Sequence, residues 1–157
     1  MPKLTALLHT ADDAARLGRA LDSLRPCDQL LVVDHGSQDS TCEVAQQHGA
    51  SVIHALPGVE GGAYAIDAEH DWVLCLLPSE ALSEALEASL LEWKQSDPDE
   101  LTGFAMNIRE EMEAGWRVLP AETRLVNRAA VAWTSVLPPH GPAVHELAGD
   151  LLRFRTP

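Results

Sequence analysis

Two carboxylates and a flexible glycine follow an apolar run in LLVVDHGSQDST, residues 30–41. Asp34 comes directly after the apolar residues, and Asp39 follows five positions later. A carboxylate at a strand end can accept hydrogen bonds from a ribose diol or a nucleobase N–H, and Gly36 lets the backbone come close to a ring. The same residues suit a purely structural turn, in which Asp34 forms an Asx turn and Asp39 or Ser40 caps the next helix. Both interpretations are open on local grounds.

The elements around this stretch alternate between strand and helix patterns. Short apolar runs of strand length lie at residues 4–8, 30–33, 51–54 and 72–77. Segments with helix signals follow them near residues 13–24, 40–48, 63–69 and 83–93. Ser40 and Glu43 have the spacing of a capping box at the second of these helices, and Ser83 opens the last one. This alternation predicts a layered α/β sheet with parallel strands as far as about residue 96.

The last third of the chain has a different pattern. Short extended segments are expected at residues 103–109, 123–127, 131–135 and 150–154, with no comparable helix between them. We therefore expect mixed or antiparallel strands to complete the sheet. Trp116 lies in the loop-like EAGWRVLP and is expected to be exposed.

Composition excludes several classes of partner. The 157 residues include 24 acidic and 11 basic ones, which gives a formal net charge of −13. Such a chain repels nucleic acid and anionic membrane surfaces. The longest apolar runs are far shorter than the ~20 residues that span a bilayer, and no signal-peptide pattern opens the sequence. We expect a soluble, cytoplasmic protein, in which Cys27, Cys42 and Cys75 are inert structural thiols.

Common phosphate and nucleophile motifs are missing. The sequence has no G-x-G-x-x-G, no G-x-x-x-x-G-K-[ST] and no G-x-S-x-G. A dinucleotide fold and a P-loop NTPase therefore have little support. A small hydrolase or phosphate-binding domain that uses His35 and Ser37 is also disfavoured, because residues adjacent in sequence do not make a catalytic triad.

Three segments carry a family resemblance: LTALLHTADDAARLGRALDSL, LLVVDHGSQDSTCEVAQQHGASVI and DWVLCLLPSEALSEAL. They resemble the N-terminal half of family 2 glycosyltransferases of the GT-A fold, and in particular the branch that glucosylates lipopolysaccharide cores. Arg124-Leu125-Val126 and Val144-His145-Glu146 are similar to two elements near the end of that branch's catalytic domain. The resemblance implies a single glycosyltransferase-like domain over residues 1–157. Residues 1–96 would form its nucleotide-binding half and residues 97–157 a reduced acceptor-side part.

The resemblance also implies roles for individual residues. Asp34 would contact the uracil or ribose of a UDP-sugar, with Asp39 supporting it. The neighbouring backbone at Gly36 and the loop that begins with His9 and Thr10 would complete the nucleoside pocket. Glu146 would act as the general base that takes the proton from an acceptor hydroxyl.

The chain departs from the family pattern where the diphosphate should be neutralised. That family usually holds Mg²⁺ or Mn²⁺ with an Asp-x-Asp pair after the fourth strand. Here Leu77-Pro78-Ser79 replaces the pair, and Glu80 is the one remaining acid that could hold such a cation. Arg124 and His145, together with His140, are candidates to contact the phosphates in place of the metal.

Two functions follow from this mixture of matches and departures. One is a domain that binds a nucleotide or nucleotide-sugar and transfers the sugar to an acceptor hydroxyl. The alternative is a non-catalytic interaction or regulatory module that retains the fold. The helical C-terminal extension usual in that branch is not found in the sequence, and an uncovered apolar sheet face would favour a homodimer.

Overall fold

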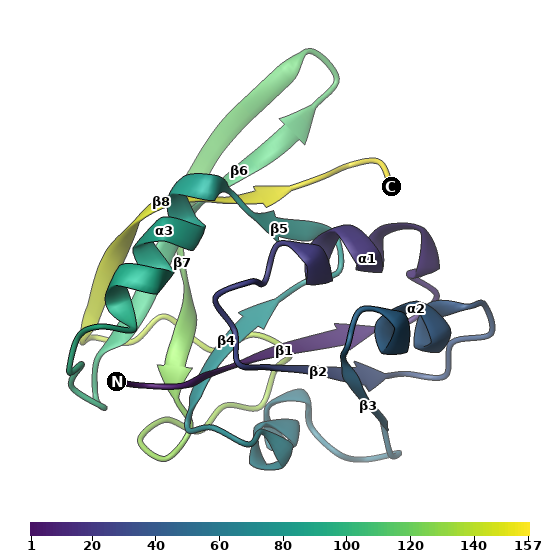
Figure 1. Ribbon diagram of the computed structural model, residues 1–157, viewed down its shortest axis with the longest axis horizontal. Helices are drawn as coiled ribbons and strands as arrows, with labels where there is room; N and C mark the ends of the chain where they lie inside the picture. The colour runs from purple at the N-terminus through teal and green to yellow at the C-terminus, as the bar shows by residue number, and fades with distance from the viewer.

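The computed structural model describes residues 1–157 and contains one eight-stranded sheet with helices packed on it (Figure 1). The strands are β1 (Leu4–Thr10), β2 (Gln29–Asp34), β3 (Ser51–His54), β4 (Trp72–Leu76), β5 (Glu80–Leu82), β6 (Gly103–Met112), β7 (Gly115–Asn127) and β8 (Val144–Arg153). The helices are α1 (Ala14–Asp22), α2 (Thr41–Gln47), α3 (Glu84–Trp93) and the 3₁₀ helix η1 (Gly61–Asp67). The strand order is β3-β2-β1-β4-β7-β6-β8-β5.

The pairing confirms the predicted α/β class and the division of the sheet. Strands β3, β2, β1 and β4 are parallel neighbours, so their carboxyl ends lie at one edge. Beyond them the pairing is mixed, because β7 is antiparallel to both β4 and β6, whereas β8 runs parallel to β6. The parallel part positions the loops that follow β1 and β2 side by side.

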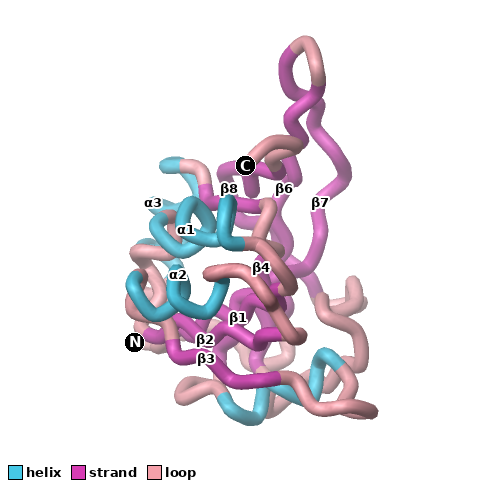
Figure 2. The backbone as a smooth tube through the Cα atoms, turned by 90° about the vertical axis from the view of Figure 1, so that its right-hand side faces the viewer, coloured by secondary structure: helices cyan, strands magenta, loops and turns pink.

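Each face of the parallel strands has its own apolar core. On one face Leu4, Ala6 and Leu8 pack in the core under the helices α1, α2 and α3, which gather on that side of the sheet (Figure 2). On the other face Leu7 packs with Tyr64 of η1 and with Trp133. This alternation along β1 follows from the period of two in a strand. A residue's place in a strand therefore decides which face its side chain joins.

Several local predictions need correction. Residues 131–135 form no strand, and β5 was not predicted because Pro78-Ser79 was interpreted as a break before a helix. Trp116 is 45% exposed as expected, but it lies in β7, whose hairpin with β6 projects from the body of the molecule (Figure 2).

The two predicted helix starts have different outcomes. The capping box at α2 is wrong, since Ser40 makes no side-chain capping hydrogen bond. At α3 the prediction is confirmed, because the Ser83 hydroxyl accepts a hydrogen bond from the Leu86 N–H at 3.2 Å. No helix of the chain is both long and apolar enough to cross a membrane.

Candidate functional site

The loops after β1 and β2 meet at the carboxyl edge of the parallel strands. Thr10 and Asp34, the last residues of these strands, are direct neighbours in the register. The Gln38 N–H donates to Asp12 Oδ1 at 2.7 Å, and the Asp12 N–H donates to Ser37 Oγ at 2.9 Å. Because each loop binds the other, the residues that end both strands are held in one arrangement.

Asp34 is held by the turn that follows it. Its side chain is buried, and Ser37 donates its N–H to Oδ2 at 3.1 Å and its hydroxyl to Oδ1 at 2.5 Å. Burial alone raises the pKa of Asp34, but the hydrogen bonds from Ser37, Cys42 and Gly36 outweigh it and lower the pKa. Gly36 has φ of +81°, a conformation that favours glycine. The structural turn considered from the sequence is therefore present, with an ionised carboxylate inside it.

Asp39 is exposed, and its carboxylate is hydrogen-bonded to the first residue of α2. It accepts hydrogen bonds from the N–H and the hydroxyl of Thr41, and a longer one from the Ala14 N–H at 3.3 Å. The bond from the Thr41 hydroxyl is the main cause that lowers the pKa of Asp39. Asp39 thus links the starts of α1 and α2 behind Asp34.

His9 lies buried at the end of β1 and contacts a second histidine. Its Nδ1 shares a hydrogen bond with His35 Nε2 at 2.8 Å, and its ring meets Tyr64 edge-on at 5.8 Å. Burial, followed by the nearby His35, lowers the pKa of His9 to about 4, so the ring is neutral at neutral pH. The buried Nε2 of His9 has no hydrogen-bond partner. Thr10, also buried, donates its hydroxyl to Asp13 at 2.7 Å.

Sequence reasoning missed Asp12 and Asp13 as residues that build this edge, and it considered His35 and Ser37 only for a hydrolase or phosphate-binding function. Their contacts between the two loops join positions 25 to 28 residues apart, and no local pattern reports such pairings. The one available signal was that they flank His9, Thr10 and Asp34 in two loops expected at the same edge.

Glu80 and Arg124 form a buried ion pair. Neither side chain has exposed surface, and Arg124 Nη1 and Nη2 lie 2.6 and 2.9 Å from Glu80 Oε1 and Oε2. Arg153 adds a contact to Glu80 Oε2 at 3.0 Å, and the Leu77 N–H donates to Oε1 at 2.8 Å. Burial lowers the pKa of Arg124, but its contacts with Glu80 outweigh that effect and raise it. The structure therefore gives both residues a structural role in an ion pair, and their metal and phosphate contacts stay predictions.

The residues that stand where family 2 glycosyltransferases have the Asp-x-Asp pair do not suit a bound cation. Leu77, Pro78 and Ser79 bring no carboxylate, and both oxygens of Glu80 are occupied by arginines. The chain offers a different group of potential cation ligands. Asp34, Cys42 and His54 each present one ligand atom, and these atoms lie within 4.8 Å of one another.

His145 and Glu146 lie at the start of β8, away from the loops described above. The His145 ring packs edge-on against Phe104, which in turn contacts Trp72 at 5.9 Å between ring centroids. Trp72 pairs with Leu4, the first residue of β1, and so marks the amino edge of the sheet. In the sheet order, β4, β7 and β6 separate His145 and Glu146 on β8 from β1, and neither residue makes a hydrogen bond or ion pair with Asp34. His140 contacts the Thr123 hydroxyl at 2.9 Å.

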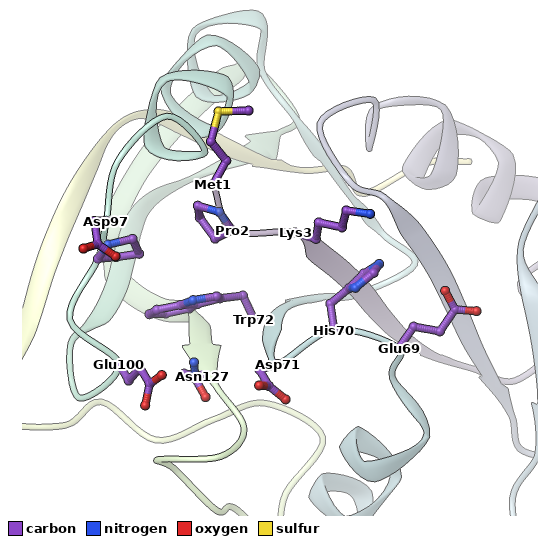
Figure 3. Close-up of a pocket in the computed structure, with 11 residues that line it drawn as sticks. Met1, Pro2, Lys3, Glu69, His70, Asp71, Trp72, Asp97, Glu100 and Asn127 are labelled. Atoms are coloured by element: carbon purple, nitrogen blue, oxygen red, sulfur yellow. The ribbon is translucent and has the colours of Figure 1, made fainter.

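A polar pocket of about 500 Å³ opens at this amino edge (Figure 3). The aromatic ring of Trp72 forms part of the pocket wall. Four acidic residues also line the pocket: Glu69, Asp71, Asp97 and Glu100. None of the residues predicted from the sequence to bind nucleotide, phosphate or metal lines this pocket. The two edges of the sheet therefore offer separate polar surfaces.

Sequence comparison relates the chain to bacterial proteins. No protein-family model matches it. An uncharacterized glycosyltransferase of Rickettsia felis is 35% identical over 92 residues, which cover 55% of this chain and 32% of that protein. A TPR repeat-containing protein of Synechococcus elongatus is 33% identical over 121 residues, which cover 73% of this chain and 29% of that protein. The chain thus spans about a third of the length of the curated relatives that it matches.

Solved structures decide the fold. TarS of S. aureus superposes on 81% of this chain and 28% of its own, with a TM-score of 0.58 and 17% identity. The chain has the GT-A fold. Glucosyl-3-phosphoglycerate synthase of Mycobacterium tuberculosis, in a complex with Mg²⁺ and UDP, superposes on 67% of this chain and on 44% of the synthase chain. The TM-score is 0.53 and the sequence identity is 18%. The predicted resemblance to glycosyltransferases is confirmed at the level of the fold. Membership of the lipopolysaccharide branch stays a prediction.

Proposed function

We propose that this chain binds the nucleoside part of a nucleotide-sugar at the carboxyl ends of β1 and β2. The observation that carries the proposal is the convergence of Asp34, His9 and Gly36 at one edge of a GT-A sheet. The ionised Asp34 carboxylate can accept hydrogen bonds from a base N–H or a ribose hydroxyl, and Gly36 leaves room for a ring. TarS in a complex with UDP-GlcNAc supports a nucleotide-sugar as the ligand class, with a TM-score of 0.54 to this chain.

Calorimetry with UDP and UDP-glucose, with and without Mn²⁺, tests the proposal. We expect 1:1 binding, and we expect Asp34→Asn to weaken it about tenfold or more, because a charge-assisted hydrogen bond contributes about 1.5–3 kcal/mol. Asp97→Asn is the matched control, since Asp97 is an exposed acid at the opposite edge of the sheet. Circular dichroism establishes that both variants are folded. Absence of heat at millimolar UDP or UDP-glucose would refute the proposal.

A second candidate function is a non-catalytic interaction module that keeps the nucleotide pocket. The observations that favour it are the loss of the Asp-x-Asp pair and the enclosure of Glu80 by two arginines. Sugar transfer with Glu146 as general base stays a prediction. UDP release from UDP-glucose with Mn²⁺ separates the two, because turnover at the rate of an ordinary transferase, about 1 s⁻¹ or faster, contradicts the module.

The predicted homodimer belongs to this second candidate. Exposed apolar side chains on the β6–β7 hairpin, such as Val118 and Trp116, would provide a contact surface. Light scattering over a range of protein concentrations measures the mass in solution. A monomer at every concentration would count against self-association as the route of interaction.

A further inference from the structure

Three side chains with complementary metal-binding chemistry converge between β2, β3 and α2. Asp34 ends β2 and His54 ends β3, and these two residues are direct neighbours in the parallel register. Val32 and Val52, two positions earlier on each strand, pack in the core under the helices. By the period of two, Asp34 and His54 also face the helix side. Cys42 comes from the first turn of α2, which covers that face.

The separations are close to those of a first coordination shell. His54 Nδ1 lies 3.8 Å from Asp34 Oδ2, and the three ligand atoms, with Cys42 Sγ, all lie within 4.8 Å of one another. Ligands at ~2.0–2.3 Å from a tetrahedral metal ion are roughly 3.3–3.8 Å apart. Only small movements of the His54 and Cys42 side chains are needed, and the His54 side chain is 75% exposed and free to make them. The exposure of His54 also gives an ion a path from solvent.

The Asp34 carboxylate is oriented by groups outside the ligand set. Ser37 fixes it with its N–H at 3.1 Å and its hydroxyl at 2.5 Å. Such hydrogen bonds to a ligating carboxylate set its orientation and are typical of metal sites. The site is therefore built on two strand ends and one helix turn, with its acidic ligand already positioned.

We propose that Asp34, Cys42 and His54 bind a zinc ion. Thiolate and imidazole ligands select zinc over Mg²⁺ or Mn²⁺, which prefer oxygen ligands. Three protein ligands leave the fourth tetrahedral position to water or to an incoming molecule. This site is distinct from the position of the family's Asp-x-Asp pair, which lies after β4. Cys42 then has a role beyond the inert thiol expected from the sequence.

Zinc at this site would occupy the carboxylate that we assign to nucleoside binding. Zinc and a nucleoside are then expected to compete for Asp34. This consequence rests on the proposed function, whereas the metal site itself does not. Metal binding is therefore measured first, in the absence of any nucleotide.

Co²⁺ as a spectroscopic probe for zinc tests the site directly. We expect the EDTA-treated protein to bind one Co²⁺ with a thiolate-to-cobalt charge-transfer band in the near ultraviolet, and Zn²⁺ to displace it. Cys42→Ser should abolish the band, and His54→Gln should weaken affinity about tenfold or more. The control variants Cys27→Ser and His70→Gln, which remove a thiol and an imidazole outside the cluster, should keep it. No band in the wild-type protein, or a band that survives in Cys42→Ser, would overturn the proposal.

Discussion

At the scale of single residues, Glu80 and Arg124 form an ion pair that is buried between β5 and β7. Both side chains are fully covered, and the pair joins β5 to β7 across 44 positions of sequence. Taking two charges out of water costs several kcal/mol for each ion, which the short contacts and the added hydrogen bonds offset. The pair therefore becomes costly when one partner is removed.

We predict that Glu80→Gln lowers the free energy of unfolding by about 3 kcal/mol, because it leaves the buried Arg124 charge with only Glu122, at 3.1 Å. Urea denaturation measures the change. The double variant Glu80→Leu/Arg124→Met should recover part of the loss, since no buried charge is then left unpaired. As a control, Glu110→Gln, which breaks an exposed hairpin ion pair with Arg117, should cost about 1 kcal/mol or less. Equal losses in Glu80→Gln and Glu110→Gln would contradict this account.

His9 makes stability depend on pH. Its pKa falls from 6.5 to about 4 in the folded chain, mainly through burial. Between pH 6.5 and 4 the unfolded chain therefore binds more protons at this residue, so stability falls as the pH is lowered through that window. The full effect is at most ~3 kcal/mol, because one pKa unit corresponds to about 1.36 kcal/mol. At neutral pH His9 is neutral in both the folded and the unfolded chain, so none of this stability is lost.

We predict that His9→Gln flattens the pH dependence of the unfolding midpoint between pH 4 and 6.5. The matched variant His70→Gln, which removes a partly buried histidine at the other edge, should leave the slope as in the wild type. Below pH 4 the hydrogen-bonded Asp28, Asp34 and Asp39, whose pKa values are lowered, add to the loss of stability in all three proteins. An unchanged slope in His9→Gln would show that other groups control this window.

At the scale of elements, α3 and β8 approach each other as closely as a glycine permits. Gly149 has φ of +97°, and a Cβ atom there would lie 2.4 Å from the Leu86 backbone nitrogen. We predict that Gly149→Ala destabilises the chain by about 2 kcal/mol or more, through both strain and overlap. Gly58→Ala shares the positive φ without any close neighbour and should cost about 1 kcal/mol, whereas Gly141→Ala should be nearly neutral. Thermal denaturation of the three variants separates the contact from the strain, and a neutral Gly149→Ala would refute the close packing.

The elements also show which features can be predicted from sequence. The four parallel strands follow from apolar runs whose periodicity is local, and Ser83 caps α3 as its neighbours indicated. The strand β5 was missed because its pairing with β8 joins Glu80 to Arg153, which no local pattern reveals. The same reason applies to the site. Asp34 could be located at a strand end, but the burial of Arg124 and the position of Glu146 on β8, separated from β1 by β4, β7 and β6, depend on pairings in the last third of the chain.

At the scale of the whole molecule, charge sets the conditions under which a nucleotide can bind. The chain carries −13, and the loops after β1 and β2 bring together Asp12, Asp13, Asp34 and Asp39, with Arg16 as a neighbouring cation. Arg124 and Arg153, whose charges could balance a diphosphate, form ion pairs with Glu80 instead. The nucleoside edge therefore has a negative potential that opposes a phosphorylated ligand more than a neutral one.

We predict that UDP binds more tightly as salt is raised from about 20 to 300 mM NaCl, while the affinity for uridine stays constant. The Debye length shortens from more than 10 Å to less than 8 Å over this range, so the repulsion between the acidic loops and the diphosphate is screened. Calorimetric titrations of both ligands at each salt concentration measure the effect. Asp12→Asn, which removes one of these charges, should reduce the salt dependence for UDP. A UDP affinity that falls with salt would instead indicate a cationic phosphate site, as in most proteins that bind phosphates through arginine and lysine.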